Sequence, residues 1–410
     1  MAKRHIAQTV LAPVLWPLSK LYAFFMRIRS ILYDADVLPS SSIPSFTVSV
    51  GNLSWGGTGK SPLVDALLSF ADAARIRAAV LTRGYGATVG GTVRACPDGG
   101  FADPADAGNK PKINGTADEP LMLAAAHPEA VVLIDPKRKR AAELLFNESL
   151  SPASPDLVLL DDGFQHRAIR RDLDLVLLDK DDFAPSRFFS ADTNWDRVLP
   201  LGTWREGISA AERADAFLVK CPQNEWGVLR ELAQKRLAPL QNNKSRPLFA
   251  FELRPVGLRN ILTRTLYDGS LFSAEPYSLL CAVGNPKQVL DTAAAMLGHA
   301  PDRCLTFRDH SDFSGSEEEI ERIASKTVVV CTAKDAVKLG GRARNAAVRR
   351  SPSSSPLAGI YCLETVFHPY AALFDSGGGG WRSWWETQWL AGKKSQAIDP
   401  GHPPKPSAVR

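Results

Sequence analysis

The chain has 410 residues, of which 45% are hydrophobic and 23% are charged. At about 150 residues per domain, this length predicts two packed domains of ordinary globular composition. The net charge of +5 is too small to favour a nucleic-acid partner, and six cysteines without a CxxC pair favour free thiols in a reducing compartment over a disulfide framework.

Residues 1–35 are basic and apolar. The apolar stretch Ile6–Met26 is interrupted by Pro13, Pro17 and Lys20, so it falls short of the roughly 20 apolar residues that a membrane-spanning helix needs. After Pro17 the large apolar residues share one helical face with basic residues at its edges, which predicts an amphipathic helix lying in a membrane interface. A helix packed on the protein's own core and a transit peptide are the alternatives.

Residues 36–211 alternate between buried-strand and helical patterns, which predicts an α/β domain with a P-loop NTPase-like parallel sheet and helices on both faces. The expected strands are Phe46–Val50, Ala78–Leu81, Val131–Asp135, Leu157–Leu160 and Leu173–Asp179. The Gly/Pro/Asp-rich residues 97–116 predict a surface loop.

Residues 212–370 predict a second, smaller α/β domain, with a basic, Ser/Pro-rich and mobile insertion at 341–357. Its expected strands are Ala216–Lys220, Leu248–Leu253, Ser278–Val283 and Thr327–Cys331. Residues 371–410 predict a Trp-rich helix packed on the N-terminal domain, followed by a disordered tail from Lys393.

A phosphate-binding loop stands between the first strand and the first helix of the main domain. It reads Ser54, Trp55, Gly56, Gly57, Thr58, Gly59, Lys60, Ser61, and Ser54 replaces the first Gly of the GxxxxGK[ST] pattern. Glycines let backbone N–H groups turn onto phosphate oxygens at a helix N-terminus. Lys60 is expected to reach the β- and γ-phosphates of ATP, and Ser61 to bind Mg²⁺.

A carboxylate partner for Mg²⁺ is expected where the apolar run Leu157–Leu160 ends in Asp161 and Asp162. The carboxyl end of a parallel strand opens into the same crevice as the phosphate-binding loop. Alone, such a string is often structural, but together with the loop it favours a metal site.

An ordered set of motifs resembles the tetraacyldisaccharide 4′-kinase family, the lipid A kinases. The motifs run in order from about Pro17 to Leu339, and the specific ones are SVGNLSWGGTGKSP at 49–62, RGYG at 83–86, DEP at 118–120, DDGFQH at 161–166, RVLP at 197–200, GNP at 284–286, DH at 309–310 and KDAVK at 334–338. Two departures are Ala333, where an acidic residue is usual, and Ser311, where a second His is frequent.

The resemblance implies an ATP- and Mg²⁺-dependent kinase for the 4′-hydroxyl of an acylated glucosamine disaccharide 1-phosphate. It implies that Asp118 activates the sugar hydroxyl with help from His310. Gln165 follows Asp161 and Asp162 in the sequence and is therefore expected to line the nucleotide site. Arg83, Glu119 and Arg205 are candidate substrate-binding residues. The basic cluster Lys137–Arg140 either binds the substrate's phosphate or lipid headgroups or forms a solvated helix face. Without the resemblance, Asp118 reads as a helix N-cap and His310 as part of a surface pair.

The resemblance further implies docking on the cytoplasmic face of a membrane, the inner membrane in a bacterium or a mitochondrial one in a eukaryote. The oligomeric state is not predicted. Two other functions stay open, a P-loop GTPase or ATPase switch and an inactive membrane-associated binding protein. The sequence has no NKxD guanine-reading motif, and it keeps the reactive side chains Lys60, Asp118 and Asp161.

Overall fold

The computed structural model describes residues 2–104, 111–115, 117–146, 154–183, 198–241, 244–308, 311, 313–347, 359–375 and 377–398. His310 lies outside this part of the chain, as do residues 348–357 of the predicted insertion and the tail beyond 398.

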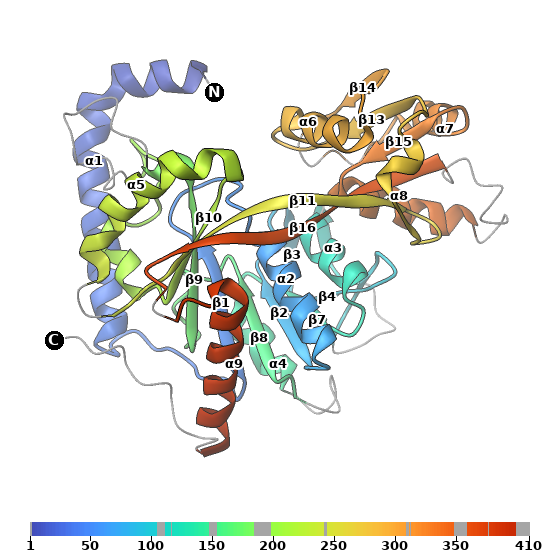
Figure 1. Ribbon diagram of the computed structural model, residues 1–410. Coiled ribbons are helices and arrows are strands. Elements are labelled where there is room, and N and C mark those ends of the chain that lie inside the picture. Colours follow the sequence, from blue (N-terminus) through green and yellow to red (C-terminus); the bar gives the residue numbers. More distant parts are fainter. Residues whose placement is uncertain are drawn as a thin grey trace.

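The nucleotide-binding half is built on a parallel sheet (Figure 1), as predicted. Its strands, in the spatial order β10-β9-β1-β8-β2-β7, all pair in parallel. They are β1 (Phe46–Asn52), β2 (Ala78–Thr82), β7 (Val131–Ile134), β8 (Leu157–Asp161), β9 (Leu173–Asp179) and β10 (Ala216–Lys220). All residues of β1 are buried although Thr47 and Ser49 are polar, and most residues of the other strands are apolar. Such sequences are typical of strands that are covered on both faces.

Helices cover both faces of this sheet, also as predicted. On one face α2 (Lys60–Ala73), α3 (Asp118–Ala126) and α9 (Gly380–Ile398) share a core with alternate strand residues such as Leu159. On the other face α4 (Arg138–Leu145) and α5 (Trp226–Leu237) pack against the intervening residues. This alternation follows from the two-residue period of a strand.

Short antiparallel strands extend the sheet beyond β7 and form a separate two-stranded sheet. Here β4 (Val93–Ala95) pairs with β7 and with β5 (Phe101–Ala102), and β3 (Ala87–Val89) pairs with β6 (Ile113–Gly115). Strands β5 and β6 fall within residues 97–116, so that loop prediction was wrong for these two segments. Such two- and three-residue strands have no length over which a sequence pattern can develop.

The second unit is connected to the first by two long strands, β11 (Leu248–Asn260) and β16 (Ile360–Leu373), which pair in antiparallel fashion from one unit to the other (Figure 1). Beyond them lie three parallel-paired strands, the short strand β12 (Leu266–Tyr267) and three helices. These are β13 (Tyr277–Cys281), β14 (Arg303–Thr306), β15 (Val328–Cys331), α6 (Pro286–Leu297), α7 (Glu317–Ala324) and α8 (Ala333–Ala347).

Two of the predicted boundaries differ from the structure. Strand β10 and the first part of β11, expected to open a second domain at residue 212, extend the nucleotide-binding sheet through β9. Helix α8 continues to Ala347, so the first part of the predicted mobile insertion at 341–357 is helical. The sequence of a buried strand is similar in either domain, and it does not reveal which other strand it pairs with.

The C-terminal helix α9 packs on the N-terminal domain as predicted, with Trp385 and Trp389 buried in its core. Gly392 allows the helix to approach β1, because a Cβ at this position would collide with the ring of Phe46. The helix continues to Ile398, beyond the predicted start of disorder at Lys393. Lys393 lies over the Trp389 ring at 5.3 Å and so adds a cation–π contact to this last part.

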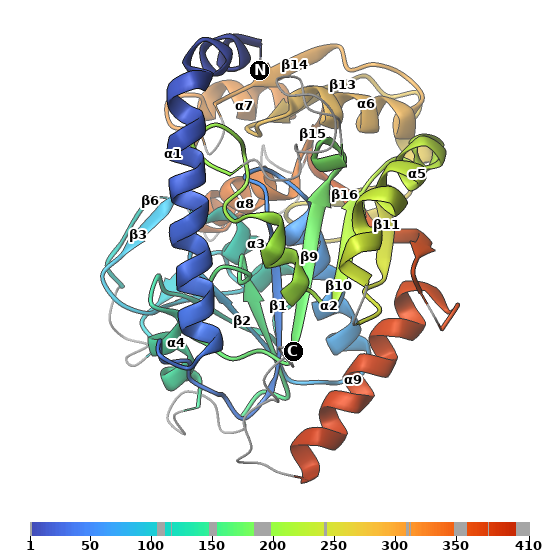
Figure 2. The same cartoon turned by 90° about the vertical axis from the view of Figure 1, so that its left-hand side faces the viewer.

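The N-terminal helix α1 (Ala2–Asp34) begins well before Pro17 and includes both prolines. One side packs against the α5 face (Figure 2), where Tyr22 and Ala23 join the core and Ser19 Oγ accepts a hydrogen bond from Leu201 N at 2.9 Å. The other side exposes large apolar side chains, namely Leu11, Val14, Trp16, Leu18, Leu21, Phe24, Phe25, Ile28 and Ile31. Among the described helices, none is long and apolar enough to cross a membrane.

Candidate active site

The phosphate-binding loop connects β1 to α2, as the sequence predicted. Gly59 precedes the first residue of α2 with a φ of 95°, a left-handed value that glycine adopts without strain. The loop exposes Trp55, Gly56 and Gly57, whereas Ser54 and Thr58 are buried. The open side of the loop therefore presents backbone amides and a helix N-terminus, an arrangement that binds anions.

Hydrogen bonds between buried polar side chains fix the loop on the side that faces the protein interior. Asn52 Nδ2 donates to Thr58 Oγ1 at 3.2 Å, and Ser54 Oγ donates to Asp182 Oδ2 at 3.0 Å. Trp204 Nε1 donates to the other oxygen of Asp182, also at 3.0 Å. Burial raises the pKa of Asp182 to about 6. The serine that replaces the first glycine of the motif is thus a buried anchor, and Asp182 is a partner that no sequence motif indicated.

Asp161 is the last residue of β8 and is buried beside β1. Its Oδ2 accepts a hydrogen bond from Thr82 Oγ1 at 2.8 Å. Burial, with the negative charges of Glu119 and Asp162, raises the pKa of Asp161 to about 6. Within the described residues its buried Oδ1 has no hydrogen-bond partner, which is costly unless a cation or a proton satisfies it.

Asp162 follows with a φ of 50° and lies among cations. Its carboxylate is 3.5 Å from Lys60 Nζ and 2.8 Å from Arg205 Nη1. Burial alone would raise the pKa of Asp162, but the charges of Lys60 and Arg205 outweigh it and lower the pKa below its usual value. Asp162 therefore stays ionised next to the phosphate-binding loop.

The basic cluster Lys137–Arg140 divides into side chains with different environments. Arg138 is buried and donates to the carbonyl oxygens of Asp161 and Asp162 at 2.6 and 3.2 Å. Arg140 forms an ion pair with the buried Asp135 at 2.7 Å. These two arginines are therefore structural, and neither alternative, phosphate or headgroup binding or a solvated helix face, describes the cluster as a whole.

Gln165 connects Asp162, through Arg205, to the base of the loop. Its Nε2 donates to Asn52 O at 2.9 Å, and its Oε1 accepts from Arg205 Nη1 at 3.3 Å. Arg29 of α1 donates to Gln165 O at 3.0 Å, so the N-terminal helix contacts this turn directly. Arg83 is exposed. Burial, together with the positive charge of Arg83, lowers the pKa of Arg138.

Asp118 and Glu119 open α3 and face the second unit. Asp118 Oδ2 is 3.0 Å from Lys338 Nζ, and Glu119 Oε1 is 2.5 Å from Lys334 Nζ. Burial would raise the pKa of Glu119, but Lys334 together with a hydrogen bond to Ser61 lowers it. The structure thus brings Glu119 to the phosphate-binding loop, with Asp118 beside it as the first residue of α3.

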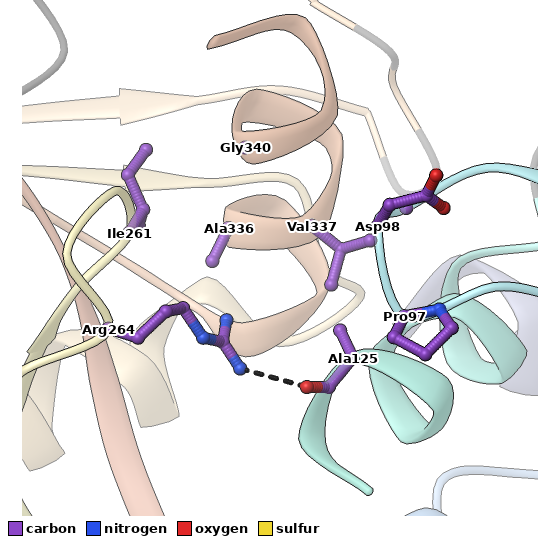
Figure 3. A pocket seen from close by; sticks show the side chains of 9 residues that line it. Pro97, Asp98, Ala125, Ile261, Arg264, Ala336, Val337 and Gly340 are labelled. Atoms are coloured by element: carbon purple, nitrogen blue, oxygen red, sulfur yellow. Dashed lines mark hydrogen bonds between the residues drawn. The ribbon is translucent and has the colours of Figure 1, made fainter. Parts of the chain in front are cut away.

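The other end of α3 also touches the second unit. Arg264 Nη2 donates to Ala125 O at 3.2 Å at the edge of a small pocket (Figure 3). Ile261 and residues of α8 such as Val337 line the pocket from one side, and the Pro97–Asp98 turn lines it from the other. The contact surface between the two units therefore runs along α3.

The residues present fit a magnesium ion of the kind found in P-loop kinases. Mg²⁺ usually takes one or two carboxylates together with a hydroxyl, water and the phosphates of the nucleotide. Asp161 offers a buried oxygen that has no partner among the residues the structure describes, and Asp162 and Ser61 border the same loop. Among the described residues there is no all-protein cluster of three or more His, Cys, Asp or Glu side chains that could hold a metal.

Comparisons with known proteins agree with this geometry. The model of the family described as tetraacyldisaccharide-1-P 4′-kinase matches residues 11–362. A tetraacyldisaccharide 4′-kinase of Nitratidesulfovibrio vulgaris is 38% identical over 398 residues, covering 94% of this chain and 97% of the relative. One of Oleidesulfovibrio alaskensis is 38% identical over 392 residues, covering 94% and 98%.

A solved structure extends the likeness to three dimensions. The crystal structure of the Aquifex aeolicus protein LpxK in complex with ATP matches with a TM-score of 0.63 and 25% identity, over 89% of this chain and 95% of that one. The fold is therefore that of a P-loop kinase with a mostly parallel central sheet. By the extent of the family match and the identity to its members, the chain belongs to the tetraacyldisaccharide 4′-kinase family.

Proposed function

We propose that the chain transfers the γ-phosphate of ATP to the 4′-hydroxyl of an acylated glucosamine disaccharide 1-phosphate, a lipid A precursor, at a membrane surface. Membership of the kinase family and the likeness to an ATP-bound protein support this proposal. The observation that carries it is the convergence of the phosphate-binding loop, the Asp161–Asp162 pair and the start of α3 on one site.

Residues 54–61 are assigned to the nucleotide, with the amides at Gly57 and Gly59 on the phosphate oxygens and Lys60 on the β- and γ-phosphates. Ser61, Asp161 and Asp162 would hold Mg²⁺, which when bound neutralises charge on the phosphate oxygens. Lys60 and Arg205 both lie beside Asp162, so ATP would compete with this carboxylate for the Lys60 ammonium.

Asp118 is assigned as the general base. It accepts the proton of the sugar hydroxyl as the oxygen bonds to the γ-phosphorus, and the bond between the γ-phosphorus and the bridging oxygen breaks to release ADP. His310 is assigned, from the family resemblance, to assist Asp118. Arg83, Glu119 and Arg205 are assigned to the side of the site that receives the substrate.

Helix α1 is assigned to the membrane surface. Its exposed apolar side faces away from the core that Tyr22 and Ala23 join, and large exposed apolar patches mark interaction surfaces. Because α1 contacts Gln165 through Arg29, docking through α1 would bring the active site close to a substrate that resides in the same membrane.

Phosphate transfer from labelled ATP tests the function. We expect an acylated disaccharide 1-phosphate to be labelled and the deacylated sugar to be labelled far more slowly. Asp118→Ala is expected to lower turnover by at least about a hundred-fold, the usual contribution of a positioned acid–base group. Lys60→Ala is expected to lower it by about a hundred- to a thousand-fold, because a cation that stabilises charge on the phosphate is lost. Release of inorganic phosphate without labelling of either acceptor would instead favour a nucleotide-hydrolysing switch.

A further inference from the structure

Two lysines of the second unit face two adjacent carboxylates of the first. Lys338 and Lys334 lie one helical turn apart on α8 and contact Asp118 and Glu119, the first two residues of α3. We propose that Lys338 is a positioning residue for phosphate transfer, which orients the Asp118 carboxylate across the boundary between the two units. This inference rests on the proposed role of Asp118 as the general base.

The Lys338–Asp118 pair differs from the surface ion pairs of the chain in its burial. The side chains of Lys338 and Asp118 are only 7% and 2% exposed. An exposed ion pair contributes little to stability, and its side chains can adopt many geometries. A buried ion pair loses its hydration and keeps a single geometry. Because an apolar pair of similar volume is often equally stable, a buried ion pair at the start of the helix that carries the proposed base points to a function other than stability.

The second unit holds Lys338 firmly. Its Nζ donates to Ser311 O at 2.9 Å, lies 3.9 Å from Asp335 Oδ1 and sits over the ring of Phe313 at 5.7 Å. Asp335 is itself fixed, because it accepts hydrogen bonds from Ala282 N and Thr332 Oγ1. The ammonium is thus a fixed point from which the carboxylate of Asp118 can be oriented.

The neighbouring pair supports the same geometry. Lys334 contacts Glu119, whose carboxylate also bonds to Ser61 at the start of α2. At the far end of α3, Arg264 holds Ala125 O. The second unit therefore contacts α3 at both ends. The position of Asp118 depends on contacts between the two units.

A general base must lie within hydrogen-bond reach of the proton that it accepts, and a misplacement of about 1 Å can cost about a hundred-fold in rate. Removing the Lys338 ammonium is therefore expected to lower kcat by about a hundred-fold and to change KM for ATP by less than about three-fold. Lys338→Arg keeps the cation and is expected to recover part of the lost kcat.

A double-mutant cycle tests the inference in the full-length protein with labelled ATP and the acylated disaccharide 1-phosphate. The variants are Lys338→Met, Asp118→Asn and the double variant, with Lys326→Met, an exposed lysine after α7, as the matched control. If Lys338 acts through Asp118, the double variant is no slower than Asp118→Asn alone, within about three-fold. Lys338→Met keeps the aliphatic stem over Phe313, and circular dichroism verifies that each variant is folded.

Three results would overturn the inference. Wild-type or higher turnover in Lys338→Met would mean that the lysine is neutral or blocks Asp118. Effects that multiply in the double variant would mean that Lys338 acts independently of Asp118. Near wild-type turnover in Asp118→Asn would remove the base assignment itself, and this outcome is recognisable without any lysine variant. Should Lys338→Met fail to fold, Lys338→Arg and Lys338→Gln are compared in its place, with equal turnover of the two counting against the inference.

Discussion

His127 connects the helix of the phosphate-binding loop to the helix that carries Asp118, and its charge makes this connection dependent on pH. The ring, at the C-terminal end of α3, contacts Asp72 Oδ2 through Nδ1 at 2.6 Å and Asp65 Oδ1 through Nε2 at 3.0 Å. Burial lowers the pKa of His127, but the hydrogen bonds and charges of the two α2 carboxylates outweigh it and raise the pKa above 6.5. We predict that His127→Gln destabilises the protein more at low pH than at high pH.

The size of the effect follows from the exposure of the two carboxylates. A hydrogen bond between charged groups contributes about 1.5–3 kcal/mol when it is shielded from water. The side chains of Asp65 and Asp72 are 37% and 41% exposed, however, and exposed ion pairs contribute only about 0.2–1 kcal/mol each. Together the two contacts of His127 are expected to contribute about 0.4–2 kcal/mol.

The sign follows from proton linkage. Because the folded state binds the proton more tightly, the stabilisation is complete below the unfolded pKa of about 6.5 and is lost as the pH rises through the higher folded pKa. Urea unfolding at about pH 5.5 and about pH 9 should therefore give a larger difference between wild type and His127→Gln at the lower pH. Asp65→Asn and Asp72→Asn should each reduce this pH dependence. A difference of equal size at both values would refute the argument.

Two further predictions concern α1 and the metal carboxylates. The double variant Leu18→Glu, Phe25→Glu, with both changes on the exposed side of α1, should bind anionic vesicles at least about a hundred-fold more weakly in a sedimentation assay, because each buried apolar side chain contributes about 1.5–3 kcal/mol to binding. Leu390→Glu on α9 is the control. Equal vesicle binding by the double variant and the control would count against a membrane role for α1. Arg138→Met should lower the free energy of unfolding by about 3 kcal/mol, as two charge-assisted hydrogen bonds are lost, and should reduce kcat. The exposed Lys139→Met should do neither, and a stable, active Arg138→Met would contradict this role.

The sequence predicts those strands and loops that are encoded by a pattern of neighbouring residues. The strands β2, β7, β8 and β9 are near-continuous aliphatic runs, and the phosphate-binding loop follows from glycine spacing at a strand–helix junction. The position of Asp161 at the end of its strand follows in the same way, because parallel strands end at one edge of the sheet.

Partners from distant parts of the chain are not predicted in this way. Arg138 reads as a solvated helix residue, and only the fold shows that its guanidinium lies beneath Asp161 and Asp162. Asp182 reads as one acidic residue among several, although it anchors Ser54. In both cases the partner lies more than twenty residues away in sequence, at a distance that no helical or strand periodicity encodes.

The two long strands that join the units also determine how those units can move. A single flexible linker would let the second unit swing freely, but here two antiparallel strands cross together and are hydrogen-bonded along the crossing. Any opening of the site would have to twist or flex this pair of strands, whose pairing is irregular between Ala250 and Phe251 and between Pro255 and Gly257. Elastic return of the strands would bring Lys338 back to the same place on α3 after each turnover, without a search for the closed arrangement.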